Sequence, residues 1–267
     1  MRLLLGACLL ACALPLAAVE RVVSLAPSMT EIMLELDAAD LLVGVLDAGE
    51  RPPALVGLPS LGRHEQVELE TLLSLKPDLI LLWPDSVTPS QREQLRLTGI
   101  PLHIGEPHDL QELAEQFAAV GARIGRERQG RELAERFRAG LQRLRQTYRR
   151  EPPLPVFYQV WHQPLYTIGG GQIISDALRL CGAENVFAEL QLAAPQVSVE
   201  AVLQRDPAVI LAGSVAELQT WQAWPQLRAT RRQQLWAVPD KGLERPSFQM
   251  LAATEKLCEL LLRAQRN

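Results

Sequence analysis

The sequence predicts an α/β protein made of two similar lobes that one long helix connects. Three observations support this prediction: short apolar strand patterns alternate with helical patterns, a segment of the first half is repeated in the second, and a charged amphipathic stretch lies between the halves. Alternating strands and helices imply parallel sheets covered by helices. The chain of 267 residues is long enough for two such domains of about 120 residues each.

The composition excludes several other classes of protein. Hydrophobic residues make up 48% and charged residues 22% of the chain, which is typical of a folded globular protein and not of a disordered one. The net charge of -4 provides no positive field that could hold nucleic acid. We therefore expect no nucleic-acid partner.

Residues 1–18 have the pattern of a secretory signal peptide. Arg2 precedes an uncharged, mostly apolar run over 3–18 that ends in small residues. This run is shorter than the roughly 20 residues that a membrane-spanning helix needs. We expect cleavage near Ala18 and an exported protein; lipidation at Cys12 and a retained N-terminal anchor are the alternatives.

The first lobe is predicted over residues 19–124. Its first unit is a short apolar strand, a Pro27-Ser28 turn and a helical pattern. The predicted strands are 21–25, 41–46, 79–83 and 101–104, and the predicted helices are 30–36, 69–75, 89–97 and 110–124.

A linking helix is predicted over residues 125–151. Leu133, Phe137, Leu141, Leu144 and Tyr148 follow one another at spacings of 4, 4, 3 and 4, which places them on a single apolar stripe. Two prolines at 152 and 153 end the helix, because proline lacks an N–H and clashes with the preceding turn. We expect this helix to hold the lobes rather stiffly.

The second lobe, predicted over residues 152–267, contains a repeat of the first. Residues 66–82 align without a gap to residues 196–212, and seven of the 17 positions are identical. Each copy has the pattern of a short helix, a proline and a buried strand. The predicted strands are 156–160, 208–212 and 235–238, and the predicted helices end near 181, cover 198–205 and 215–221, and begin near 247. We expect a ligand cleft between the lobes, where α/β proteins commonly bind small molecules.

Glu70 and Glu200 occupy the same position in the two copies, at the start of the paired helices. The helix dipole stabilises a carboxylate there by about 0.3–1 kcal/mol, which is a purely structural explanation. The functional alternative is a symmetric pair of acidic groups that docks onto a partner with two-fold symmetry.

Cleavage near Ala18 would leave two cysteines, Cys181 and Cys258, in an oxidising compartment. We expect them to form a disulfide; two buried free thiols are the alternative.

Several motifs occur in a definite order and spacing from about residue 20 to the C-terminus. They are Ser24–Glu31, Val43–Val45, Leu69-Glu70 with Leu75–Leu79, Leu82-Trp83, Cys181-Gly182 with Glu184–Phe187, Pro195–Ser198 with Glu200, and Glu244–Ser247. Together these motifs resemble the family of periplasmic vitamin B12-binding proteins of cobalamin ABC importers. This family belongs to a broader group that binds cobalamin, haem and iron–siderophore chelates.

The resemblance implies two Rossmann-like lobes joined by a single rigid helix, as in the class III, helical-backbone periplasmic receptors for metal-containing ligands. It implies a monomer in the periplasm that holds a corrinoid in the cleft as transported ligand, with no cofactor of its own. It also implies an inner-membrane ABC permease as partner, with Glu70 and Glu200 contacting arginines of the permease, and a pairing of Cys181 with Cys258.

We assign ligand contacts to both lobes. Trp83 ends an apolar strand, where open α/β sheets present ligand contacts, and flat macrocycles need apolar and aromatic walls. A tryptophan that only caps the sheet, or a packed turn at 161–166, is the structural alternative. The assigned residues are Pro27, Ser28, His64, Trp83, Trp161, His162, Tyr166, Lys241, Gly242, Leu243, Glu244 and Arg245.

Two positions depart from the resemblance, because aromatic residues of the family fall on Ala48 and His64. His64 and His162 could ligate cobalt or iron, since neutral imidazole is the commonest protein metal ligand. No cysteine or carboxylate cluster accompanies them, so we predict no bare-metal site.

The sequence is compatible with two other functions. The same receptor role could serve haem or a ferric siderophore. An exported α/β enzyme is the alternative from another class, but the sequence contains no Gly-x-Ser-x-Gly or His-Glu-x-x-His motif. We therefore predict a binding protein without catalytic residues.

Overall fold

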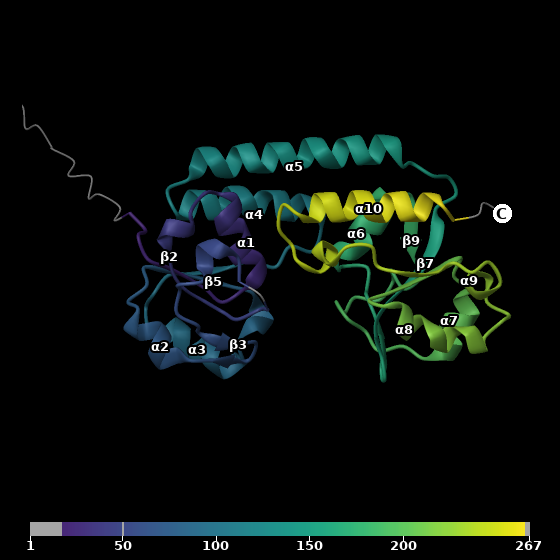
Figure 1. Ribbon diagram of the computed structural model, residues 1–267, viewed down its shortest axis with the longest axis horizontal. Helices are drawn as coiled ribbons and strands as arrows, with labels where there is room; N and C mark the ends of the chain where they lie inside the picture. The colour runs from purple at the N-terminus through teal and green to yellow at the C-terminus, as the bar shows by residue number, and fades with distance from the viewer. Residues whose placement is uncertain (1–17, 50, 265–267) are drawn as a thin grey trace, which may run out of the picture.

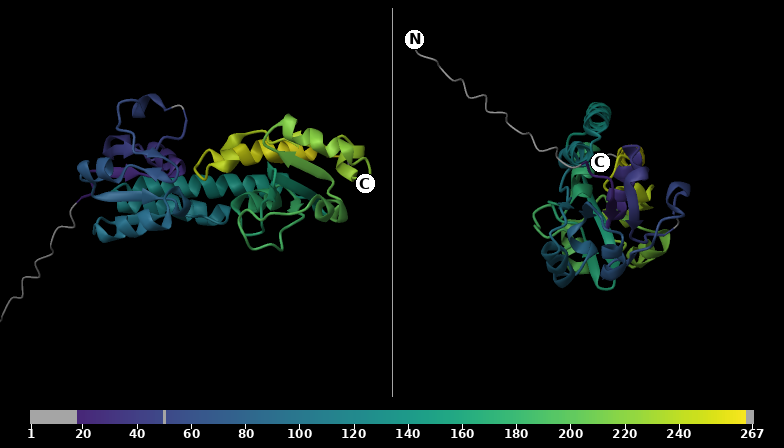
Figure 2. Two further views of the ribbon diagram at one scale, coloured as in Figure 1. Left: turned by 90° about the horizontal axis from the view of Figure 1, so that it is seen from below. Right: turned by 90° about the vertical axis from the view of Figure 1, so that its left-hand side faces the viewer.

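The computed structural model describes residues 18–49 and 51–264. Two α/β lobes lie side by side, and the long helix α5 (Glu127–Thr147) extends along one side of both (Figure 1). Viewed down the long axis, α5 lies at the outer edge of the molecule (Figure 2). The predicted signal peptide lies outside the described residues, except for Ala18.

The N-terminal lobe is built on a parallel four-stranded sheet with the order β2-β1-β5-β6. A two-stranded antiparallel hairpin, β3-β4, lies outside this sheet. The elements of this lobe are β1 (Val22–Ser24), α1 (Pro27–Glu35), η1 (Ala39–Leu41), β2 (Leu42–Val45), η2 (Pro53–Leu55), β3 (Gly62–Arg63), β4 (Gln66–Val67), α2 (Leu69–Ser74), β5 (Leu79–Leu82), η3 (Pro84–Ser86), α3 (Pro89–Leu97), β6 (Leu102–Ile104) and α4 (Leu110–Arg123).

Both faces of the central strands are buried, as expected of a parallel sheet between two layers of helices. In β5, Leu79 and Leu81 pack in the cluster that contains α1 and α4, whereas Ile80 and Leu82 pack on the opposite side with Leu72 of α2. This alternation follows from the period of two along a strand.

The C-terminal lobe has a five-stranded sheet with the order β11-β10-β7-β8, and β9 pairs with the first residues of β7, at the end of that strand away from β8. Only the β7-β8 pairing is antiparallel among the described strands of this sheet. The elements of this lobe are β7 (Leu154–His162), β8 (Leu165–Thr167), α6 (Ile173–Leu180), β9 (Ala183–Asn185), α7 (Val199–Arg205), β10 (Val209–Ala212), α8 (Val215–Leu218), η4 (Gln219–Ala223), α9 (Arg228–Arg231), β11 (Leu235–Ala237), η5 (Lys241–Glu244) and α10 (Met250–Leu262).

The internal repeat corresponds to equivalent units in the two lobes. The first copy contains α2 and β5, and the second contains α7 and β10. Strand β5 pairs with β1 and β6, whereas β10 pairs with β7 and β11. The two copies therefore lie in separate sheets, which confirms the predicted two-lobed α/β fold.

Helix α5 packs on α4 of the N-terminal lobe and on α10 and α6 of the C-terminal lobe (Figure 1). The ring of Phe137 in α5 lies 5.3 Å from that of Phe117 in α4 and 5.9 Å from that of Phe248, which precedes α10. At 1.5 Å per residue, the 21 residues of α5 span about 32 Å. Gly130 lies within α5 where a Cβ would come within 2.7 Å of Phe117 O, so this glycine permits close contact with α4.

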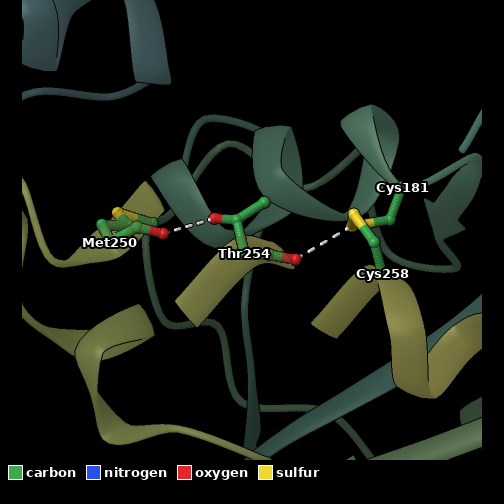
Figure 3. The surroundings of a disulfide bond; sticks show 4 residues. All are labelled: Cys181, Met250, Thr254 and Cys258. Carbon is green, nitrogen blue, oxygen red and sulfur yellow. Dashed lines mark hydrogen bonds between the residues drawn. A yellow bond between two sulfur atoms is a disulfide. The ribbon is translucent and has the colours of Figure 1, made fainter. Parts of the chain in front are cut away.

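A disulfide joins Cys181, at the end of α6, to Cys258 in α10, and the two Cα atoms are 4.7 Å apart (Figure 3). Beside it, Thr254 Oγ1 donates a hydrogen bond to Met250 O at 2.7 Å. The predicted pairing is confirmed, and the alternative of two free thiols is wrong. No helix among the described residues is long and apolar enough to span a membrane.

Candidate functional site

A cleft between the lobes contains a cavity of about 330 Å³, within the range typical of small-molecule sites. Both lobes contribute to its wall. The lining residues are Ala26, Pro27, Ser28, Ala48, His64, Trp83 and Ser86 from the N-terminal lobe, and Gln172, Ile173, Leu243, Glu244, Arg245 and Pro246 from the C-terminal lobe.

Pro27 and Ser28 reach the cavity because β1 ends beside it and α1 begins there. Ala26 is extended, and Pro27 is the first residue of α1, a position where the missing N–H of proline is no loss. The carboxyl ends of parallel strands are the usual ligand edge of such a sheet. The assignment of Pro27 and Ser28 to the cleft agrees with this geometry.

Trp83 lies at the end of β5, where Pro84 begins the short helix η3. Its side chain is half-buried, packs against the main core cluster and also lines the cavity. Trp83 therefore caps the sheet and presents a ring to the cleft at the same time.

His64 lies on the tight turn between β3 and β4. The neighbouring Gly62 and Glu65 both have positive φ angles, of 90° and 58°. A Cβ on Gly62 would come within 2.1 Å of Gln66 O, so only glycine fits there. The turn leaves His64 exposed, and its side chain lines the cavity.

The C-terminal wall comes from η5 and the residues after it. Asp240 holds this segment, because its side chain accepts a hydrogen bond from Gly242 N at 2.8 Å and pairs with Lys256 Nζ at 2.6 Å. Leu243, Glu244 and Arg245 line the cavity, as assigned. Lys241 is exposed outside the lining, and Gly242 is buried.

The second aromatic group lies on the β7-β8 hairpin, outside the residues that line the cavity. Trp161 is 54% exposed, and its Nε1 donates to Gln163 O at 3.0 Å. The rings of Trp161 and His162 lie 5.3 Å apart, and Tyr166 pairs with Trp161 across the hairpin. Ligand contact by these three side chains stays a prediction.

Some lining residues were not assigned from the sequence. Gln172 and Ile173 reach the cavity because Gln172 caps the start of α6 and Ile173 is the first residue of that helix. The sequence signal was present, since a glycine run over 169–171 directly precedes them. Ser86 lies three positions after Trp83, and Pro246 lies one position after Arg245. Neither residue type by itself indicates a ligand contact.

A smaller hollow of about 90 Å³ adjoins the cavity and shares Pro27, Ala48 and Arg245 with it. Its wall also includes Glu31 of α1, whose Oε1 lies 3.0 Å from Arg245 Nη1. This ion pair joins the two lobes beside the cleft.

Half-buried Glu35 and buried Tyr158 both have shifted pKa values. Burial, with a smaller effect of neighbouring Glu31, raises the pKa of Glu35 to about 7. Burial also raises the pKa of Tyr158, and the charge of Glu244 adds to this shift. No group of three or more metal-ligating side chains occurs in the described part of the chain.

The two repeated glutamates are exposed in the first turns of α2 and α7. Both helices lie on the side of the molecule opposite α5 (Figure 1). Ser198 caps α7 by accepting a hydrogen bond from Ala201 N, and the backbone N–H of Glu200 together with the Ser198 hydroxyl lowers the pKa of Glu200. Glu70 and Glu200 therefore belong, one per lobe, to two helices on the same side of the molecule.

Two lobes with parallel sheets, a helix that bridges them and a cleft lined from both sides define a two-lobed ligand receptor of the helix-bridged class. The family described as periplasmic binding protein matches residues 22–240, and the chain belongs to this family.

Relatives of this family support the predicted resemblance. The chain is 35% identical over 250 residues to a vitamin B12-binding protein of Vibrio cholerae, covering 92% of this chain and 91% of the relative. It is 33% identical over 249 residues to a vitamin B12-binding protein of Yersinia pestis, covering 92% and 88%. These similarities confirm the predicted resemblance to vitamin B12-binding proteins.

Solved structures agree with this result. The crystal structure of the periplasmic vitamin B12 binding protein BtuF of Vibrio cholerae matches with a TM-score of 0.84 and 34% identity, covering 93% of this chain and 99% of that chain. The periplasmic heme-binding protein HutB of Vibrio cholerae matches with a TM-score of 0.77 at 23% identity, covering 90% and 98%. The second likeness concerns the fold alone.

Proposed function

We propose that this protein is a periplasmic substrate-binding protein that captures cobalamin in the cleft between its lobes and delivers it to an ABC permease. The observation that carries the proposal is the similarity to vitamin B12-binding proteins over nine-tenths of both chains. The cavity lined from both lobes, with Trp83 at its wall, is a suitable place for the ligand.

The lining residues suit a large, flat and partly polar ligand. Trp83 and Pro27 offer apolar surface to a macrocycle, while Glu244 and Arg245 offer an acceptor and a cation to its polar substituents. Trp161 and Tyr166 would extend the aromatic surface from the β7-β8 hairpin to a ligand larger than the cavity.

Docking to the permease is assigned to Glu70 and Glu200. Both are exposed, and their helices α2 and α7 lie on the same side of the molecule, one in each lobe, which fits a partner whose two halves each present arginines. We further propose export through a cleaved signal peptide over residues 1–18, with lipidation at Cys12 as the alternative, and action as a monomer in the periplasm.

Haem or a ferric siderophore is the second candidate ligand. The observation behind this candidate is the exposed imidazole of His64 in the cavity wall, which could ligate the iron of such a ligand. Since the named relatives are binding proteins, we propose no catalytic activity.

Calorimetric titration of residues 19–267 with cyanocobalamin, haemin and ferric chelates tests the proposal. We expect saturable binding of cyanocobalamin with one site. Binding of haemin without binding of cyanocobalamin would contradict the cobalamin assignment and support the second candidate.

Replacing Trp83 tests whether the ligand lies in this cleft. Trp83→Ala should weaken cyanocobalamin binding at least tenfold, because a buried aromatic anchor contributes about 2 kcal/mol or more to an interface. Trp224→Ala is the matched control, since Trp224 is half-buried and lies outside the cavity lining. Equal affinities of the two variants would place the ligand elsewhere.

A further inference from the structure

Glu31 lies where the two lobes meet, and side chains of the opposite lobe surround its carboxylate. Arg245 Nη1 lies 3.0 Å from Glu31 Oε1, and Ser247 Oγ donates to Glu31 Oε2 at 3.0 Å. Gln249 Nε2 donates to the same Oε2. The side chain of Glu31 is 21% exposed, so the carboxylate itself is partly shielded from water.

Arg245 is held across the cleft by the N-terminal lobe. In addition to the ion pair with Glu31, its Nη2 donates to Ala48 O at 3.4 Å. The guanidinium has five donors in a rigid plane, so two fixed contacts define its orientation and leave others for a ligand. Its side chain is still 48% exposed, and it lines both the main cavity and the adjoining hollow.

The sequence contains both residues in separate motifs but does not show that they pair. Glu31 ends the Ser24–Glu31 motif and Arg245 lies in the Glu244–Ser247 motif, and the two partners are 214 positions apart in the sequence. The fold brings the motifs together because α1 begins at the carboxyl end of β1 and the second motif leads from η5 into α10.

We propose, on the basis of the proposed function, that Glu31 is a positioning residue for Arg245. Glu31 holds the guanidinium in the orientation in which Arg245 donates hydrogen bonds to carbonyl, amide or phosphate oxygens of the ligand. A free arginine side chain would lose its rotamer freedom when the ligand binds, and orienting it beforehand removes that cost. Glu31 itself touches no ligand in this scheme.

A simpler role would be a clasp that only ties the lobes together through Ser247 and Gln249. The two roles differ in one respect: a positioning residue matters for affinity only while Arg245 is present. A double-mutant cycle measures this dependence directly.

The cycle uses cyanocobalamin titrated into the wild type, Glu31→Gln, Arg245→Ala and the double variant. The glutamine keeps an oxygen that can accept from Ser247 but places an amide N–H₂ group opposite Arg245. We expect Glu31→Gln to weaken binding about tenfold in the wild-type background and to have no effect when Arg245 is alanine. Equal losses in both backgrounds would overturn the positioning role.

Ser247→Ala is the control, because it removes a hydrogen bond to Glu31 and leaves the Glu31–Arg245 pair intact. We expect its affinity to stay within about twofold of the wild type. A loss as large as that of Glu31→Gln would identify a clasp and overturn the proposal.

Thermal melting of each variant checks that it folds. If Glu31→Gln fails to fold, Glu31→Asp keeps the charge but withdraws the carboxylate from Arg245, and the same dependence on Arg245 is expected. A wild type that does not bind cyanocobalamin would remove the proposed function together with this inference, whereas binding without coupling would remove the inference alone.

Discussion

Glu35 is a carboxyl group in the contact between the lobes, one turn along α1 from Glu31. Its Oε2 accepts a hydrogen bond from Phe248 N at 3.0 Å, just before α10. Burial nevertheless outweighs this bond and raises the pKa of Glu35 from 4.5 to about 7. At this residue, the protonation state and the contact between the lobes are coupled.

The raised pKa predicts how stability depends on pH. Because the folded state prefers the protonated form, the contribution of Glu35 is fully favourable below about pH 4.5 and is lost as the pH rises through about 7. Above pH 7 the folded protein contains a charge that burial disfavours. Glu35→Gln, which can still accept from Phe248 N, should therefore raise the free energy of unfolding by ~2 kcal/mol at pH 8.

Urea unfolding of the wild type and Glu35→Gln at pH 4 and pH 8 measures this effect. At pH 4 the two proteins should have nearly equal stability, since the wild-type carboxyl group is then neutral. A variant that is less stable than the wild type at pH 8 would contradict the raised pKa.

At the scale of elements, a carboxylate of each lobe accepts a hydrogen bond from a backbone N–H at, or just before, the start of a helix in the other lobe. Asp176 of α6 accepts a hydrogen bond from Leu110 N, the first residue of α4, at 3.0 Å. Glu35 of α1 does the same for Phe248 N, two residues before α10. Helix N-termini have N–H groups without partners in the helix and attract carboxylates. These reciprocal contacts join α6 to α4 and α1 to the segment that leads into α10.

The disulfide holds α10 to α6 within the C-terminal lobe, and its removal should weaken the whole lobe. Cys181 and Cys258 are separated by 77 residues, for which the chain-entropy model gives a stabilisation on the order of 4 kcal/mol. Cys181→Ser/Cys258→Ser should therefore unfold at lower urea concentration than the wild type. Equal stability, or two reactive thiols in the denatured unreduced protein, would contradict the bond.

At the scale of the whole molecule, patterns that depend on local sequence were predicted well. The central strands, the repeat and the long helix all have clear periodicity, and the structure contains them. Strands β3, β4, β8 and β9 were not predicted: β3 and β4 have only two residues each, and the residues around β8 and β9 form no apolar run of the kind that marked the other strands. The same distinction applies to the residues of the site. Trp83 and Pro27 could be assigned from the sequence because they come directly after predicted strands. The Glu31–Arg245 pair could not, because it depends on how the lobes approach each other.

The arrangement of the two lobes also leads to a prediction about transport. Glu70 and Glu200 lie on helices α2 and α7, on the side opposite α5 and away from the residues that line the cavity. Reversing both charges, Glu70→Arg/Glu200→Arg, should leave cyanocobalamin affinity within about twofold of the wild type and reduce uptake to background, since like charges would then face the permease.

Uptake of labelled cyanocobalamin by cells or by vesicles that contain the cognate permease provides the measurement. Glu132→Arg/Glu135→Arg is the matched control, because both glutamates are exposed on α5, on the opposite side of the molecule. The two double variants change the net charge by the same amount and differ only in where the charges lie. The control should therefore transport normally, because its substitutions are on the side opposite the proposed docking helices. Normal uptake by Glu70→Arg/Glu200→Arg would show that the repeated glutamates only stabilise their helix starts, which is the role that the helix dipole alone would explain.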